Sequence, residues 1–183
     1  MRRTTKRFAG LSTIAVCAAA AVALSGTPAS AKPNDVVLAR QGTVAYHDSS
    51  VITGDTENWF QLYDLNNITC IDDPTGGMGI HFVSPSRLND PTETASQPEA
   101  IIYEPQKNGT LRLVAVEYVV TAEAWAEAGN TEPPRLDGQD FEFVEAGNRY
   151  GLPDFYEMHA WLWRHNPSGM HNDWNPKVTC QYA

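Results

Sequence analysis

Three polar residues interrupt otherwise apolar stretches of this chain and are its strongest candidates for chemistry. Glu117 lies within the apolar run Leu113–Val120, and His81 and His159 each lie in a short run of apolar and aromatic residues. A buried ionised carboxylate is costly unless it pairs with a cation, binds a metal or takes up a proton. Two imidazoles and one carboxylate on neighbouring strands form a ligand set with open positions. The sequence therefore predicts a divalent-metal site at His81, Glu117 and His159, without identifying the metal.

Other interpretations of the same residues stay open. In one, Glu117 and His159 are the catalytic pair of a metal-free acid/base enzyme, or line the site of a small-ligand binder. In the simplest one, the histidines are ordinary core residues and Glu117 pairs with Arg112 or Arg164. A further class is a non-catalytic secreted protein that binds a partner through aromatic side chains. The sequence does not decide whether the protein is an enzyme.

The segment from Glu157 to Cys180 concentrates imidazole and indole groups, with three of the five histidines and three of the five tryptophans of the chain. Side chains alternate between the two faces of a strand, so His159, Trp161 and Trp163 are expected on one face together with Glu157. Indole rings supply large rigid contact area for a ligand. The residues predicted to line a substrate pocket are Tyr103, Trp161 and Trp163.

The sequence offers further polar side chains that could lie near the predicted metal site. Glu104, Tyr103 and His47 are candidates for the first or second shell of the metal. His165 and His171 are expected at the surface or rim, because Asn166-Pro167-Ser168-Gly169 fits a type I turn that interrupts the strand.

The first 31 residues predict export. Basic residues at positions 2, 3, 6 and 7 precede an apolar run that ends at Leu24, and Ala29-Ser30-Ala31 follows as a small-residue cleavage site. This pattern is typical of a cleavable secretory signal rather than of a membrane span. We expect a secreted protein without stable membrane insertion, whose residues 32–183 form a single α+β domain.

Removal of the signal makes the chain more acidic. Residues 1–31 contain four of the 13 Lys and Arg residues and none of the 22 Asp and Glu residues, so the formal charge changes from −9 to −13. Such a charge repels nucleic acid and anionic membranes and is compatible with binding cations. The expected partner is a small molecule or a metal ion, and no nucleic acid.

The mature chain keeps two cysteines, Cys70 and Cys180. A lone pair in an exported protein is expected to oxidise, which predicts a Cys70–Cys180 disulfide. A thiolate metal or redox site is disfavoured because the chain has no Cys-x-x-Cys spacing.

Capping and turn signals predict the elements that position these residues. Asn34 or Asp35 caps a helix that extends to His47, and Thr121 caps a short helix that stops before Gly129. Asn108-Gly109 joins two strands as a hairpin. A helix followed by sequential antiparallel strands gives an α+β fold with a curved sheet or a partly closed barrel. The predicted strands cover residues 78–83, 99–104, 111–120, 141–144 and 155–164.

Motifs spread over nearly the whole mature chain carry a resemblance to a known group of proteins. They are Met78-Gly79-Ile80-His81, Pro98–Pro105, Val116-Glu117-Tyr118, His159–Trp163, Asn166–Gly169 and Asn175–Cys180. With these motifs the chain resembles a group of secreted actinobacterial (Streptomyces-type) hypothetical proteins. The resemblance implies one compact exported bacterial domain, and no activity is transferred with it.

Overall fold

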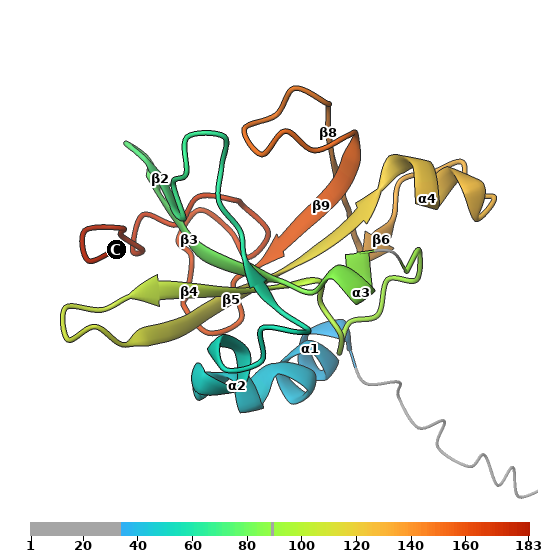
Figure 1. Cartoon of the computed structure of the whole chain (residues 1–183). Coiled ribbons are helices and arrows are strands. Elements are labelled where there is room, and N and C mark those ends of the chain that lie inside the picture. Colours follow the sequence, from blue (N-terminus) through green and yellow to red (C-terminus); the bar gives the residue numbers. More distant parts are fainter. Residues whose placement is uncertain (1–33, 89) are drawn as a thin grey trace, which may run out of the picture. The chain divides into compact units, whose positions relative to one another are not determined.

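The computed structural model describes residues 34–88 and 90–183, which fold as a mixed α/β structure around one antiparallel sheet (Figure 1). The strands in this part of the chain are β1 (Phe60–Gln61), β2 (Cys70–Asp73), β3 (Gly76–Val83), β4 (Ala100–Pro105), β5 (Leu111–Thr121), β6 (Arg135–Leu136), β7 (Gln139–Asp140), β8 (Glu142–Val144) and β9 (Phe155–Ala160). The large sheet has the order β1-β3-β4-β5-β9-β8, and β2 also pairs with β3. Strands β6 and β7 form a separate small hairpin.

The helices begin where the sequence supplies a capping side chain. Helix α1 (Asp35–Thr43) starts after Asn34, whose Oδ1 accepts a hydrogen bond of 2.9 Å from the Val37 amide, and a 3₁₀ turn, η1 (Val44–His47), continues it. Helix α4 (Ala122–Glu127) starts after Thr121, whose hydroxyl accepts from the Ala124 amide at 3.3 Å. Both predicted caps are confirmed. Two short helices, α2 (Ser50–Thr53) and α3 (Pro85–Leu88), complete the set of helices in the described residues.

The longest strands form the centre of the sheet. Strands β4 and β5 pair as the predicted hairpin, and Gly109 at its turn has a φ of +80°, which glycine adopts without strain. The predicted strand over 155–164 is too long, because β9 ends at Ala160. Beyond that point the backbone leaves the β9 ladder: the amides of Trp163 and Arg164 both donate to the Val114 carbonyl at 3.1 Å.

The sheet is open rather than closed into a barrel. Strands β1 and β2 lie at one edge and β8 at the other, and within the described residues no ladder joins these edges. Strand β1 pairs over two residues and β8 over three, so neither edge is long enough to extend the pairing around a closed sheet. The expectation of a partly closed barrel is therefore wrong, while the mostly antiparallel sheet is confirmed.

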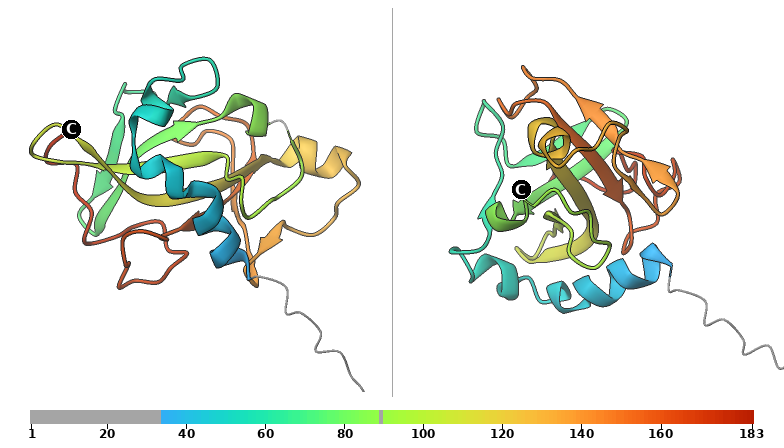
Figure 2. Two further views of the ribbon diagram at one scale, coloured as in Figure 1. Left: turned by 90° about the horizontal axis from the view of Figure 1, so that it is seen from below. Right: turned by 90° about the vertical axis from the view of Figure 1, so that its right-hand side faces the viewer.

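Each face of the sheet packs against a different part of the chain. Helices α1 and α2 run across one face, where Ala39 and Ile52 join a core with Ile101, Tyr103 and Tyr118 (Figures 1 and 2). On the opposite face, a smaller apolar cluster comprises Ile102, Val114, Ala115, Trp161 and Val178. The segment that follows β9 therefore covers part of the face away from the helices.

The C-terminal segment is also fixed covalently. Cys70 on β2 and Cys180 form the predicted disulfide, with an S–S distance of 2.06 Å. The expected signal, residues 1–31, lies outside the described residues. In the part that is described, no helix combines the length and the apolar character needed to cross a membrane.

Candidate metal centre

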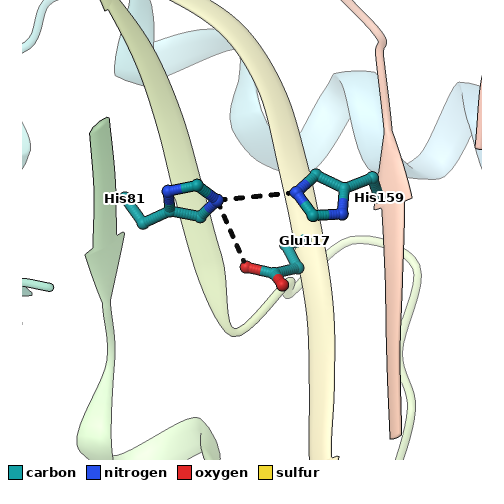
Figure 3. Close-up of side chains that lie close together, drawn as sticks. All are labelled: His81, Glu117 and His159. Carbon is teal, nitrogen blue, oxygen red and sulfur yellow. Dashed lines mark hydrogen bonds and ion pairs between the residues drawn. The ribbon is translucent and has the colours of Figure 1, made fainter. Parts of the chain in front are cut away.

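The sheet brings His81, Glu117 and His159 together on the face away from α1. Glu117 on β5 lies directly opposite His159 on β9, and Ala100 is its neighbour on β4. His81 approaches from β3, across β4, where its direct neighbour in the ladder is Ile102. Figure 3 shows the three side chains pointing toward one another from their separate strands. The convergence predicted from the sequence is present.

The three side chains are close and buried. His81 Nε2 lies 3.5 Å from His159 Nε2 and 3.7 Å from Glu117 Oε2. Each residue offers one ligand atom, and these atoms all lie within 4.8 Å of one another. The exposed fractions are 2% for His81, 6% for Glu117 and 1% for His159. A group of nitrogen and oxygen ligands this compact matches the donor set of a divalent cation.

The far edge of each imidazole faces another polar group. The His81 ring donates a hydrogen bond to the backbone of Gly79. His159 Nδ1 lies 3.3 Å from Asp173 Oδ1, but the geometry does not make a hydrogen bond, and this buried nitrogen has no hydrogen-bond partner. Metal-binding imidazoles commonly orient their second nitrogen on a carbonyl or a carboxylate. His81 has such a partner, and His159 has a carboxylate within reach.

Burial controls the charge of the site. It is the largest cause that lowers the pKa of His81 to about 3, and the nearby His159 contributes to the same shift. Burial also raises the pKa of Glu117 well above its usual range, and the neighbouring Glu157 carboxylate adds to the rise. His81 is therefore neutral at pH 7, with a lone pair available to a metal, and Glu117 lacks a full cationic partner.

The arginines considered as partners of Glu117 lie elsewhere. Arg112 is exposed at the start of β5, opposite Glu104 on β4. The Arg164 guanidinium donates to the Lys177 carbonyl at 2.8 Å. The simple interpretation of a core ion pair between Glu117 and one of these arginines is wrong.

A pocket of about 240 Å³ opens onto two of the three residues, Glu117 and His159. Glu117, His159 and Glu157 line it together with Tyr150 and Trp174. Arg149 also lines it, and its guanidinium is paired with Asp64 at 3.2 Å. A smaller apolar cavity of about 60 Å³ adjoins it and shares Glu117, Tyr150, Phe155 and Glu157. A small molecule in the larger pocket therefore contacts Glu117 and His159 directly.

The aromatic residues predicted for the substrate pocket lie elsewhere. Tyr103 is fully buried on the helix side of the sheet, where its hydroxyl donates to the Tyr46 carbonyl at 2.8 Å. The Trp161 ring stacks against the His159 ring, with their centroids 6.3 Å apart. Trp161 therefore packs behind His159 within the core. Trp163 contacts His47, with ring centroids 4.4 Å apart. Alternation fails here because β9 ends at Ala160 and the chain turns.

The two tryptophans line a different pocket. This surface hollow of about 510 Å³ is bounded by Trp161, Trp163, Arg40, His165 and Asn166. It does not include any of the three candidate metal ligands. The sequence identified aromatic pocket residues but placed them at the wrong pocket.

The remaining candidate ligands do not join the centre. The carboxylate of Glu104 accepts from the Thr179 amide at 3.3 Å, which holds it on the C-terminal segment. His47 packs on Trp163, and His165 is exposed, with its Nδ1 3.5 Å from Lys177 Nζ. His171 is half-buried, and its Nδ1 lies 2.9 Å from the His159 carbonyl oxygen, so it contacts the backbone of the site only.

The sequence did not indicate two acidic residues of the site, Glu157 and Asp173, as metal ligands. Glu157 shares the face of His159, as alternation indicated, and groups with His159 and Asp173 as a second set of ligand atoms within 4.8 Å. Asp173 lies in the loop after the Asn166–Gly169 turn. Its only signal in the sequence was its place within the segment rich in His and Trp.

Comparisons with protein-family models, with curated proteins and with solved structures find no match to this chain. The resemblance to secreted actinobacterial proteins therefore stays an expectation.

Proposed function

We propose that this protein binds a divalent cation, with Zn²⁺ as the best fit, through His81 Nε2, His159 Nε2 and the Glu117 carboxylate. One observation carries the proposal: three buried side chains from three strands place their ligand atoms within 4.8 Å of one another. Their backbones are fixed by the ladders of β3, β4, β5 and β9, so the ligands are held before an ion arrives. A ligand set fixed in this way loses little conformational entropy on binding.

The distances support zinc. Two ligand atoms about 2.05 Å from an ion and separated by the tetrahedral angle lie about 3.4 Å apart. The distances from His81 Nε2, 3.5 Å to His159 Nε2 and 3.7 Å to Glu117 Oε2, are close to this value. Mg²⁺ and Ca²⁺ prefer sites built from oxygen ligands, and two imidazoles are a poor match for them.

The charge of the site supports a cation as well. Glu117 is buried beside the Glu157 carboxylate, which is unfavourable for an ionised pair of acids in a desolvated site. The imidazole nearest to it, His81, has its pKa lowered by burial and so does not supply the missing positive charge. A divalent cation bound between His81 and Glu117 supplies that charge and stabilises the ionised carboxylate.

Three protein ligands leave a further coordination position open, which is typical of catalytic rather than structural zinc sites. The adjoining pocket of about 240 Å³ gives a small molecule access to that position. A divalent ion supplies Lewis-acid chemistry to such a molecule. A metalloenzyme is therefore the functional class that the pocket supports best, and metal-free acid/base chemistry by Glu117 and His159 is the alternative if no metal binds.

Metal uptake by an untagged protein tests the proposal. The chain is purified without a nickel column, stripped with a chelator and loaded with Zn²⁺, and its affinity is measured by competition with a chromophoric chelator. We expect His81→Ala and Glu117→Gln to weaken zinc binding by more than the about 10- to 100-fold loss typical of outer-shell changes. His165→Ala is the matched control and should bind like the wild type, because His165 is exposed and remote from the centre.

Two outcomes contradict the proposal. One is a wild-type protein that takes up no Zn²⁺, Co²⁺, Mn²⁺ or Fe²⁺. The other is an equal loss of affinity in His165→Ala and His81→Ala, because zinc would then bind to surface histidines.

A further inference from the structure

The imidazole of His159 presents both of its nitrogens to potential ligands. Nε2 faces His81 and belongs to the proposed centre. Nδ1 is buried and has no hydrogen-bond partner, although Asp173 Oδ1 lies only 3.3 Å away. Leaving a buried ring nitrogen without a partner costs free energy, so this nitrogen calls for an explanation.

A second set of ligand atoms lies on the Nδ1 side of the ring. Glu157, His159 and Asp173 each offer one ligand atom, and these atoms lie within 4.8 Å of one another. The distance of 3.3 Å between Nδ1 and Oδ1 is close to the separation of about 3.4 Å that two ligands take around a tetrahedral zinc ion. The geometry on this side of the ring therefore resembles that on the other side.

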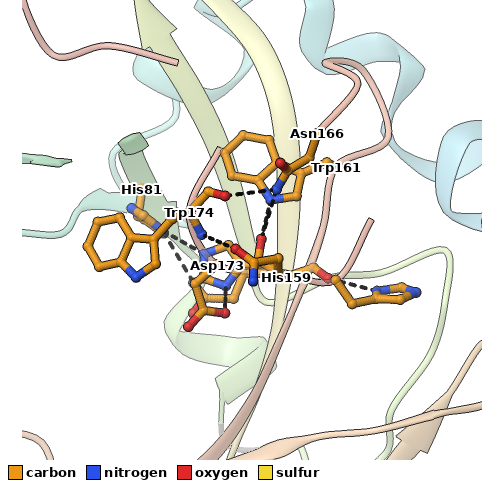
Figure 4. A network of polar contacts seen from close by, with 9 residues as sticks. His81, His159, Trp161, Asn166, Asp173 and Trp174 are labelled. Carbon is orange, nitrogen blue, oxygen red and sulfur yellow. Dashed lines mark hydrogen bonds and ion pairs between the residues drawn. The ribbon is translucent and has the colours of Figure 1, made fainter. Parts of the chain in front are cut away.

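The loop that carries Asp173 is held in place by buried polar contacts. The Asn166 side-chain amide donates to the carbonyls of Asn172 and Trp174, at 3.2 and 3.0 Å, and Trp161 Nε1 donates to Asn172 at 2.6 Å. Asn166 itself is 6% exposed. Figure 4 shows Asp173 held by this network beside the His159 ring. The position of the carboxylate is thus set by the fold.

The surroundings on this side are acidic. A pocket of about 250 Å³ is lined by Asp140, Glu142, Glu157 and Asp173, and among the described residues no Lys or Arg lines it. His171 is the basic side chain in its wall, and its Nε2 lies 3.4 Å from Asp137 Oδ2. Several carboxylates around a shared hollow attract a cation from solvent.

We propose that Glu157, Asp173 and Nδ1 of His159 form a second divalent-cation site, so that His159 bridges two ions. This inference rests on the proposed function, because the first ion occupies Nε2 of the same ring. Coordination at both nitrogens displaces the single ring proton, which is released to solvent. Glu157 lines the pockets on both sides.

Zinc stoichiometry of the full mature chain provides the first test. We expect about two zinc ions per wild-type chain, one in His81→Ala, one in Asp173→Asn and none in His159→Ala. Asp140→Asn is the matched control, because it also removes a carboxylate from this pocket. The Asp140 carboxylate is exposed and already paired with Arg135. It should keep two ions.

Cu²⁺ loading of the wild type tests the bridge without any variant. Two Cu²⁺ ions joined by one imidazole ring couple magnetically, so the electron paramagnetic resonance intensity should rise with the first equivalent and fall with the second. In Asp173→Asn, once unbound Cu²⁺ has been removed by gel filtration, the intensity should stay at that of one ion. A wild-type intensity that doubles with the second equivalent overturns the bridge, even if a variant fails to fold.

The outcomes separate this inference from the proposed function. In one outcome, the wild type and Asp173→Asn each bind one zinc ion, and the variant binds it more weakly. Asp173 then only orients His159, and the proposed function stands. A wild-type protein that takes up no Zn²⁺, Co²⁺, Mn²⁺ or Fe²⁺ refutes both.

Discussion

Glu99 offers the sharpest test of how burial governs the charged groups of this fold. Its side chain is 2% exposed, and its Oε2 accepts a hydrogen bond of 3.1 Å from the Val119 amide. Burial, with a smaller contribution from the nearby Glu93 carboxyl, raises the pKa of Glu99 from 4.5 to about 8. The substitution Glu99→Gln removes the titrating group and keeps a carbonyl oxygen that accepts from Val119.

The size and direction of the effect follow from proton linkage. Between pH 4.5 and about pH 8 the folded protein holds a proton on Glu99 that the unfolded chain has released. The contribution of Glu99 to the free energy of unfolding therefore falls as pH rises through this window. Above about pH 8 this contribution no longer changes with pH. A shift from 4.5 to about 8, at about 1.4 kcal/mol per unit, corresponds to about 5 kcal/mol.

We therefore expect Glu99→Gln to gain stability relative to the wild type as pH rises, by up to about 5 kcal/mol between about pH 4.5 and pH 8. Urea unfolding followed by tryptophan fluorescence, at several pH values from about 5 to 9 and with a chelator present, measures this difference. Glu127→Gln on α4 is the control, because its side chain is exposed. Its difference from the wild type should not change with pH.

A difference between Glu99→Gln and the wild type that stays constant over the whole pH range refutes the reasoning. It means that Glu99 ionises in the folded protein as it does in the unfolded chain. A difference that shrinks as pH rises also refutes it, because the pKa of Glu99 would then be lower in the folded protein than in the unfolded chain.

Two further predictions concern the disulfide and a helix cap. Replacing Cys70 and Cys180 together by Ser removes a link between residues 110 positions apart, which should lower the free energy of unfolding by about 4 to 5 kcal/mol in urea titrations; equal stability of the double variant and the oxidised wild type contradicts this. Thr121→Ala removes the cap on α4 and should cost about 1 kcal/mol in thermal unfolding, whereas Thr121→Ser should retain most of it. An equal loss in both variants argues against the capping bond.

Local signals in the sequence predicted the elements well where a single residue decides the backbone. Asn34 and Thr121 start helices because their side chains satisfy free amides of the first turn. Asn108-Gly109 makes the hairpin because glycine adopts the positive φ of the turn. The end of β9 was missed, since a long-range bond to the Val114 carbonyl, and no local signal, draws the chain off the sheet.

The candidate centre was predicted in part. Charged or polar side chains in apolar strands identified His81, Glu117 and His159, because burying them has a cost that must be offset. Tyr103 was misplaced, since the register shift of the β4–β5 ladder after Ile102, where Val114 on β5 is skipped, and the packing of α1 and α2 decide what its side chain contacts. Asp173 was missed, because its approach to His159 depends on how a loop folds back over the sheet.

The sequence by itself determined the three polar groups, the helix starts, the central hairpin and the pairing of Cys70 with Cys180. The first three depend on residue type and on periods of two to four residues, which are local properties of the chain, and the disulfide follows because residues 32–183 contain only two cysteines. The tertiary structure alone decided that β4 lies between β3 and β5 with Ala100 beneath the site, and that Asp173 lies against His159. Strand order and loop position depend on contacts between distant residues, and only the folded packing of the whole chain selects among them.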